Sequence, residues 1–159
     1  MIPLQKYFSE ASFWIPDRFP KSGWIEHAPF AFWLIDAFRP QTIVELGTHN
    51  GYSFLCFCQA IKTLNYHAKA YAVDTWQGDE HAGFYGEDVY QKLSSYHSAR
   101  YGEFSELVRF TFDSARERFK DGSVDLLHID GRHLYEDVRY DFESWRSKLS
   151  MQQSYSGSM

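Results

Sequence analysis

Short apolar runs alternate with longer amphipathic stretches along most of the chain. A short apolar run bounded by turn residues is typical of a buried strand, whereas apolar positions three or four residues apart are typical of a helix. Strands that alternate with helices imply a parallel sheet covered by helices on both faces, so we expect an α/β fold with about four strands. The predicted strands are 42–46, 69–74, 107–111 and 124–129, and the predicted helices are 52–64, 87–101, a short one from Ser114, and 135–149.

The chain before the first predicted strand is expected to contain an irregular arm and one helix. Prolines interrupt residues 1–23, which predicts an irregular arm anchored by aromatic side chains such as Phe13 and Trp14. Pro29 suits the first turn of a helix and Pro40 ends the helical pattern, so we expect a covering helix between them.

The rest of the chain forms one expected domain. No internal repeat or second periodic block is present, so this domain is assigned to residues 24–149. Residues 150–159 are polar and follow no pattern, which predicts a disordered tail.

Charge and composition narrow the choice of partners. The chain has 16 Lys and Arg against 21 Asp and Glu, and a net charge of -5 disfavours a nucleic-acid partner. No apolar run approaches the ~18 residues that a membrane-spanning helix needs, and the first residues lack the apolar core of a signal peptide. We therefore expect a cytoplasmic protein with a small-molecule partner and no nucleic-acid or membrane partner.

Polar residues stand at or just beyond the end of each predicted strand. Glu45 lies near the end of the first strand, Asp74 ends the second, and Asp113 with Ser114 follow the third. Asp130 follows the fourth strand. Ligands of open α/β sheets bind beyond the carboxyl ends of the strands, so these side chains predict a crevice for a polar ligand such as a nucleoside.

The loop after the first strand separates two classes of nucleoside cofactor. A nicotinamide dinucleotide site favours Gly-x-Gly-x-x-Gly, whereas this loop has Gly47 and Gly51 with Glu45 ahead of them. An acid there repels a pyrophosphate and suits S-adenosylmethionine, which carries a cationic sulfonium and an amino group. Asp74, 29 residues beyond Glu45, can accept hydrogen bonds from both ribose hydroxyls. A nicotinamide-linked oxidoreductase is the disfavoured alternative.

Three stretches resemble the class I S-adenosylmethionine-dependent methyltransferases. More narrowly, they are similar to the type 24 group, relatives of sugar O-methyltransferases such as macrocin O-methyltransferase. The resemblance covers about residues 24–149 and implies a Rossmann-like methyltransferase domain. The stretches are Val44-Glu45-Leu46-Gly47-Thr48-x-x-Gly51-x-Ser53, Ala72-Val73-Asp74-Thr75-Trp76, and His128-Ile129-Asp130-Gly131-x-His133-x-Tyr135-x-x-Val138-x-x-Asp141.

The resemblance implies a role for each matching site residue. Asp130 would face the transferred methyl group and, in metal-dependent relatives, would bind a divalent cation such as Mg²⁺. His133 would accept the proton of a substrate hydroxyl. The implied cofactor contacts are Glu45, Gly47, Thr48, Gly51 and Ser53 around the methionine part, Asp74 at the ribose with Trp76 beside it, and Asp113 and Ser114 near the adenine.

These roles describe O-methylation of a small hydroxylated acceptor, such as a sugar or a glycoside. An imidazole with a pKa near ~6.5 is a reasonable base for the hydroxyl proton. His133 could instead cap the following helix, and Asp130 could be only the N-cap of that turn. His128 lies inside a predicted strand, so we expect a hydrogen-bonded core residue there.

The chain departs from the resembled family after residue 149. The family continues with a further strand, whereas no apolar strand follows here, so we expect a C-terminally truncated domain. The strand at 124–129 would then be a sheet edge, and exposed edges pair with other chains. We expect a homodimer that buries this edge or the aromatic arm. Cofactor binding is expected to survive, while the alternative is a catalytically incomplete S-adenosylmethionine-binding module that acts as an interaction protein.

Overall fold

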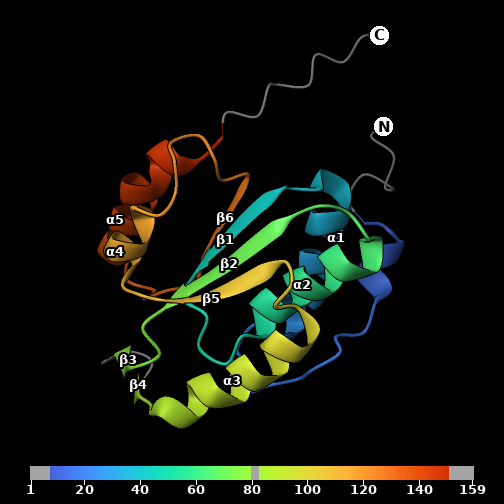
Figure 1. Cartoon of the computed structure of the whole chain (residues 1–159), viewed down its shortest axis with the longest axis horizontal. Helices are drawn as coiled ribbons and strands as arrows, with labels where there is room; N and C mark the ends of the chain where they lie inside the picture. The colour runs from blue at the N-terminus through green and yellow to red at the C-terminus, as the bar shows by residue number, and fades with distance from the viewer. Residues whose placement is uncertain (1–7, 80–82, 151–159) are drawn as a thin grey trace, which may run out of the picture.

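The computed structural model describes residues 8–79 and 83–150. Its centre is a parallel sheet of four strands in the order β5-β2-β1-β6 (Figure 1). The expected α/β, Rossmann-like fold is confirmed. The strands of this sheet are β1 (Thr42–Leu46), β2 (Lys69–Asp74), β5 (Ser105–Arg109) and β6 (Leu126–Ile129).

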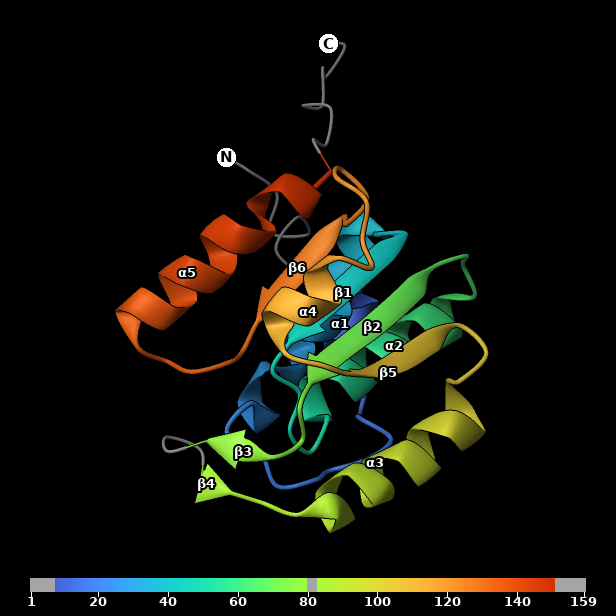
Figure 2. The same ribbon diagram turned by 60° about the vertical axis from the view of Figure 1, so that its left-hand side comes forward.

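Helices cover both faces of the sheet, as predicted (Figures 1 and 2). The apolar side chains of α1 and α2 form one core with residues such as Ile43 and Ala70, and a second core joins Val44 and Leu46 to Trp145 on the opposite face. The α-helices are α1 (Ala28–Phe38), α2 (Tyr52–Leu64), α3 (Glu87–Arg100), α4 (Phe112–Arg116) and α5 (Tyr135–Trp145), and the 3-10 helices are η2 (Glu10–Phe13), η3 (Ile25–His27) and η4 (Arg146–Lys148).

The predicted boundaries hold around β1, α2 and β2 and shift after α3. β5 ends at Arg109 rather than at residue 111, because Thr111 serves as the N-cap of α4. Its side-chain oxygen accepts a hydrogen bond from the Ser114 backbone N–H at 3.2 Å. The predicted helix start at Ser114 is therefore wrong by two residues, since Phe112 begins the helix.

The arm before α1 is only partly as expected. Trp14 packs against Phe32 of α1 with ring centroids 5.7 Å apart, as an anchor should. Phe13 is 74% exposed, so its predicted anchoring role is wrong. The segment between β2 and α3 contains the short antiparallel strands β3 (Gly78–Asp79) and β4 (Gly83–Phe84).

The edge formed by β6 is open in the described part of the chain. β6 pairs with β1 on one side, and its four residues are only partly buried. Val124, predicted as part of this strand, instead bridges Leu149. The predicted tail residues 151–159 lie outside the described residues. None of the described helices is long and apolar enough to span a membrane.

Candidate functional site

The loops that follow β1 and β6 meet at Gly47. Its φ of 87° lies in the left-handed region, and its backbone N–H donates to the Val73 carbonyl at 2.9 Å. A Cβ atom on Gly47 would lie 2.3 Å from the carbonyl oxygen of Asp130. Only glycine lets the two loops approach this closely, so Gly47 sets the geometry of the carboxyl edge of the sheet.

Two cavities adjoin this contact and share the segments Gly47–His49 and Asp130–Gly131. The larger has a volume of about 460 Å³ and the smaller about 290 Å³. The larger is also lined by Lys21, Ser22, Gly23, Trp24, Asn50, Gly51, Tyr52, Ser53 and His133, and the smaller by Asp74, Thr75, Gly78, Tyr85, Thr111, Phe112 and Arg132.

Asp74 holds the loop between the cavities in place. Its Oδ2 accepts the backbone N–H groups of Thr48 at 2.9 Å and His49 at 2.8 Å. Its Oδ1 accepts the backbone N–H of Trp76 at 2.8 Å. The Trp76 indole is buried and donates through Nε1 to the His49 carbonyl at 3.0 Å. Asp74 lines the smaller cavity, whereas Trp76 lies behind the loop and lines neither.

Gly51 and Ser53 lie where the same loop turns into α2. Gly51 has a φ of 82°, and a Cβ atom there would lie 2.5 Å from Leu93 Cδ1. Ser53 is buried in the first turn of α2. Both residues line the larger cavity, together with Thr48.

Glu45 is fully buried beneath these loops and lines neither cavity. Its Oε2 lies 2.9 Å from Nδ1 of His128, its direct neighbour across the β1–β6 ladder. The expected hydrogen bond of His128 is thus confirmed, while its side chain is only partly buried. Glu45 Oε1 has no hydrogen-bond partner among the described residues. Burial lowers the pKa of His128, but the hydrogen bond and charge of Glu45 together with the charge of Asp130 outweigh this effect, so the pKa is raised overall.

Asp130 and His133 lie together at the larger cavity. Nε2 of His133 is 3.7 Å from Oδ1 of Asp130. Burial raises the pKa of the Asp130 carboxyl, and the nearby charge of Glu45 raises it further. The histidine side chain is much more exposed to solvent than the aspartate side chain.

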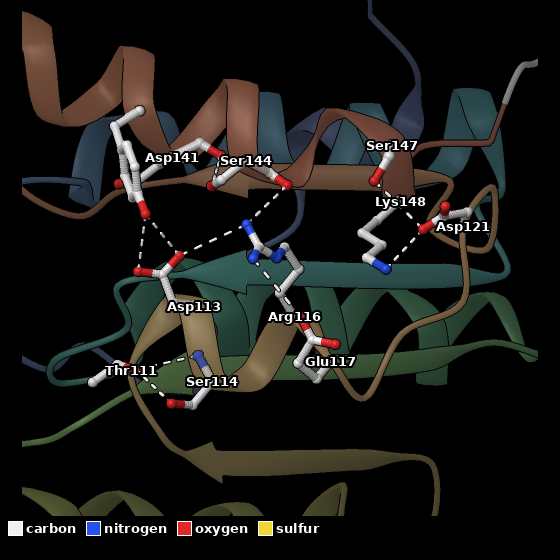
Figure 3. Close-up of polar contacts among 11 residues, drawn as sticks. Thr111, Asp113, Ser114, Arg116, Glu117, Asp121, Asp141, Ser144, Ser147 and Lys148 are labelled. Carbon is white, nitrogen blue, oxygen red and sulfur yellow. Dashed lines mark hydrogen bonds and ion pairs between the residues drawn. The ribbon is translucent and has the colours of Figure 1, made fainter.

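Asp113 and Ser114 do not line either cavity. The Tyr140 hydroxyl donates to the Asp113 carboxylate at 3.2 and 3.1 Å, and Arg116 lies 3.8 Å from it, so Asp113 faces α5 (Figure 3). Thr111 and Phe112 line the smaller cavity instead. Threonine is a favoured N-cap residue, so Thr111 was a sequence signal that α4 begins at Phe112 and that these two residues stand at the strand end.

A cavity wall from the N-terminal arm was missed by sequence reasoning. Residues 21–24 line the larger cavity. Asn50 Nδ2 donates to the Lys21 carbonyl at 2.9 Å, and the Tyr52 hydroxyl donates to the Ile25 carbonyl at 3.1 Å. The arm lies far from this loop in sequence, and no local motif signals the contact.

The predicted Mg²⁺ finds no ligand set in the described part of the chain. No group of three or more His, Cys, Asp or Glu side chains there is placed to hold a metal ion. Asp130, the predicted ligand, has His133 as its near neighbour and a buried Glu45 below it. These residues do not fit a hard cation that needs several oxygen ligands.

Comparison with known proteins agrees with this architecture. A model of a methyltransferase-domain family matches residues 44–152. The uncharacterized protein y4gI of Sinorhizobium fredii is 55% identical over 131 residues, which is 82% of this chain and 14% of that protein.

Two solved structures have the same fold. A candidate caffeoyl-CoA O-methyltransferase from Staphylococcus aureus aligns with a TM-score of 0.61 and 15% identity, over 85% of this chain and 56% of that one. The S-adenosylhomocysteine-bound methyltransferase PaMTH1 of Podospora anserina aligns with a TM-score of 0.58 and 18% identity, over 89% and 56%. This chain therefore spans little more than half of these structures. Its family match establishes that the chain belongs to the type 24 methyltransferase-domain family.

Proposed function

We propose that this chain is an S-adenosylmethionine-dependent methyltransferase that methylates a hydroxyl group of a small acceptor. The pair of adjoining cavities at the carboxyl end of the sheet carries this proposal. One cavity can take a nucleoside and the other a reacting centre, and the two meet at the Gly47–Asp130 contact. The cofactor product bound to PaMTH1, which has the same fold, supports the assignment.

The smaller cavity suits the adenosine part of the cofactor. Asp74 Oδ1 accepts one backbone hydrogen bond in the structure, which leaves a lone pair for a ribose hydroxyl. Phe112 provides an aromatic face for adenine, and Thr111 lies beside it. Asp113 and Ser114 contribute indirectly: they follow this pair in α4, and the Ser114 backbone N–H donates to the Thr111 side chain. Trp76 contributes indirectly as well, because its indole donates to the His49 carbonyl and so supports the loop after β1.

The larger cavity suits the methionine part and the acceptor. Gly47, Thr48, Gly51 and Ser53 form one wall, and the buried charge of Glu45 lies beneath and favours a cationic ligand. The arm supplies the opposite wall, including the Trp24 ring. An aromatic wall facing hydrogen-bonding groups fits a hydroxylated acceptor such as a sugar or glycoside.

The cofactor, when bound, would supply a methyl group from a cationic sulfur, and the sulfur would leave as a neutral thioether when its bond to that carbon breaks. His133 accepts the proton of the acceptor hydroxyl at its imidazole, so that the oxygen can form the new bond to carbon. Asp130 lies 3.7 Å from that imidazole and stabilises the imidazolium that results. The loops hold the acceptor and the cofactor in line, and alignment supplies much of the rate enhancement in such displacements. No metal ion enters this proposal.

The second candidate is a cofactor-binding module without turnover. The chain spans 56% of the Staphylococcus aureus structure and 56% of PaMTH1, so groups that those proteins contribute elsewhere have no counterpart in the alignment. Binding without methyl transfer is the property that separates this candidate from the first.

Calorimetry and an activity screen test both candidates. We expect S-adenosylhomocysteine to bind and a nicotinamide dinucleotide not to bind. Transfer of a labelled methyl group to a panel of sugars and glycosides should be lost in His133→Ala and retained in His67→Ala, an exposed histidine away from both cavities. Absence of S-adenosylhomocysteine binding at millimolar concentration would reject the proposal, and binding without any transfer would favour the module.

The partner that we propose at the open edge of β6 is a second copy of the chain. An antiparallel pair of β6 strands about a twofold axis would continue the sheet, and would bring α1 against α1 and α5 against α5. Exposed apolar side chains on these helices, Phe38, Val138 and Phe142, suit such contacts.

A further inference from the structure

His128 connects the buried Glu45 to the arm that walls the larger cavity. One side of its ring reaches Glu45 through Nδ1 at 2.9 Å. The ring also contacts Trp24 of the arm, with centroids 5.1 Å apart at 67°. Phe57 of α2 supports the same ring at 5.5 Å and 83°. Histidine is thus placed between a carboxylate and two aromatic rings.

The contact with Glu45 is needed because a buried carboxylate is unstable without a partner. Glu45 is fully buried, and among the described residues its Oε1 makes no hydrogen bond. Among the described residues, the hydrogen bond from His128 is therefore the contact that compensates the carboxylate at Oε2. An apolar residue at 128 would leave a charge uncompensated in the core.

The contact with Trp24 is one of a small set of contacts that hold residues 21–24 against the rest of the fold. Beyond the aromatic contacts of Trp24 with Phe57 and His27, the segment is tied through Asn50 to Lys21 and through Tyr52 to Ile25. These two hydrogen bonds flank Trp24 in sequence. The indole is the apolar contact between them, and it packs against the rings of both His128 and Phe57.

We propose that His128 is a positioning residue: by bonding Glu45 and carrying Trp24, it holds residues 21–24 closed as a wall of the larger cavity. The closure of the arm follows from the contacts alone. Its effect on the acceptor, a weaker binding when the wall is released, rests on the proposed function.

The two contacts can be separated by changing both partners. Glu45→Gln removes the buried charge, so the ring at 128 can then be changed without leaving a charge uncompensated. Glu45→Gln/His128→Phe keeps an aromatic ring beneath Trp24, and Glu45→Gln/His128→Ala removes it. The matched pair differs in the ring at position 128, and therefore in the packing against Trp24 and Phe57.

Limited trypsin digestion measures the release of the arm. Cleavage after Lys21 reports the arm, and cleavage after the exposed Lys120, at the opposite end of the sheet, reports general loosening of the fold. We expect the ratio of the Lys21 rate to the Lys120 rate to rise about fivefold or more in Glu45→Gln/His128→Ala, since local opening exposes only the nearby bond. Glu45→Gln/His128→Phe should keep the wild-type ratio.

Equal ratios in the two double variants would overturn the proposed support of Trp24. The single variant His128→Phe tests the other contact: loss of folding or a large drop in melting temperature is expected, and wild-type stability would overturn the proposed compensation of Glu45. If the wild-type protein binds no S-adenosylhomocysteine, the proposed function fails, while the digestion ratios still decide the role of His128. If it binds, the acceptor KM should rise more in the Ala double variant than in the Phe double variant.

Discussion

Asp74 shows how one side chain can serve both the loop and a ligand. Three backbone N–H groups, from Thr48, His49 and Trp76, converge on its carboxylate. Hydrogen bonds to a charged acceptor are stronger than those between neutral groups. The residue therefore shapes the contact between the cavities before any ligand arrives.

Removal of this carboxylate should abolish cofactor binding. In Asp74→Ala, the three N–H groups lose their acceptor and the loop loses its conformation, so we expect the Kd for S-adenosylhomocysteine to rise by about a hundredfold or more. Calorimetry measures the change. Asp88→Ala, in the exposed first turn of α3, is the control and should bind as the wild type does. Equal affinity in both variants would contradict the role of Asp74.

Asp141 is expected to make the stability of the fold depend on pH. Burial, together with the charges of Asp137 and Asp113, raises the pKa of this carboxyl to about 6. The folded state therefore favours the protonated form, and its contribution to stability is present at acidic pH and is lost as the pH rises through about 6.

Asp141→Asn should remove the loss of stability that the wild type shows as the pH rises. We expect the variant to be more stable than the wild type at pH 8 by about 2 kcal/mol, and to differ little from it near pH 4. Urea denaturation at the two pH values measures the difference. The exposed Asp88→Asn serves as the control. If the variant and the wild type differed in free energy of unfolding by the same amount at pH 4 and at pH 8, Asp141 would not titrate as described.

At the scale of elements, the position of the site depends on how loops from different strands meet. The β1–α2 loop contacts the loop after β6 through Gly47 and Asp130. Residues 21–24 of the arm close the other side. These contacts join segments that are distant in sequence.

Gly47→Ala tests the first contact. The added Cβ would lie 2.3 Å from the Asp130 carbonyl oxygen, and the positive φ is itself unfavourable for alanine. We therefore expect the free energy of unfolding to fall by about 3 kcal/mol. Gly122→Ala is a matched control, because Gly122 also has a positive φ of 71° but no atom within 4 Å of the added Cβ. The free energy of unfolding of Gly122→Ala should fall by only about 1 kcal/mol. Thermal denaturation compares the two, and equal losses would contradict the close approach of the loops.

Prediction of the elements succeeded where local pattern and local structure agree. The bounds of β1, α2 and β2 match their predicted ranges, because each is a periodic run ended by a turn or a cap. The α4 boundary failed, because both Thr111 and Ser114 can cap a helix and the choice depends on where β5 leaves the sheet. Val138 and Phe142 follow the helical stripe of α5, yet both are partly exposed because no strand lies beyond β6 in the described sheet.

At the scale of the whole molecule, the open edge of β6 predicts self-association. Unpaired strand edges with apolar flanks promote pairing with another chain. Light scattering should give a mass of twice the 18.7 kDa of one chain. Phe38 and Leu126 of β6 line one cleft. Phe38→Glu places a charge there and should shift the protein toward the monomer. Phe13→Glu changes an exposed residue of the arm and should leave the dimer intact. A dimer lost only in the second variant would place the interface on the arm.

The sequence by itself determined the alternation of strands and helices, the Gly47–Gly51 loop, and the acids near the strand ends. These features are local, because periodicity, turn chemistry and motif spacing lie within short segments. Tertiary structure alone decided that Glu45 is buried against His128, that Thr111 and Phe112 rather than Asp113 and Ser114 line the smaller cavity, and that residues 21–24 form a cavity wall. Each of these depends on how distant segments pack, and side-chain burial is set by packing partners that no local pattern identifies.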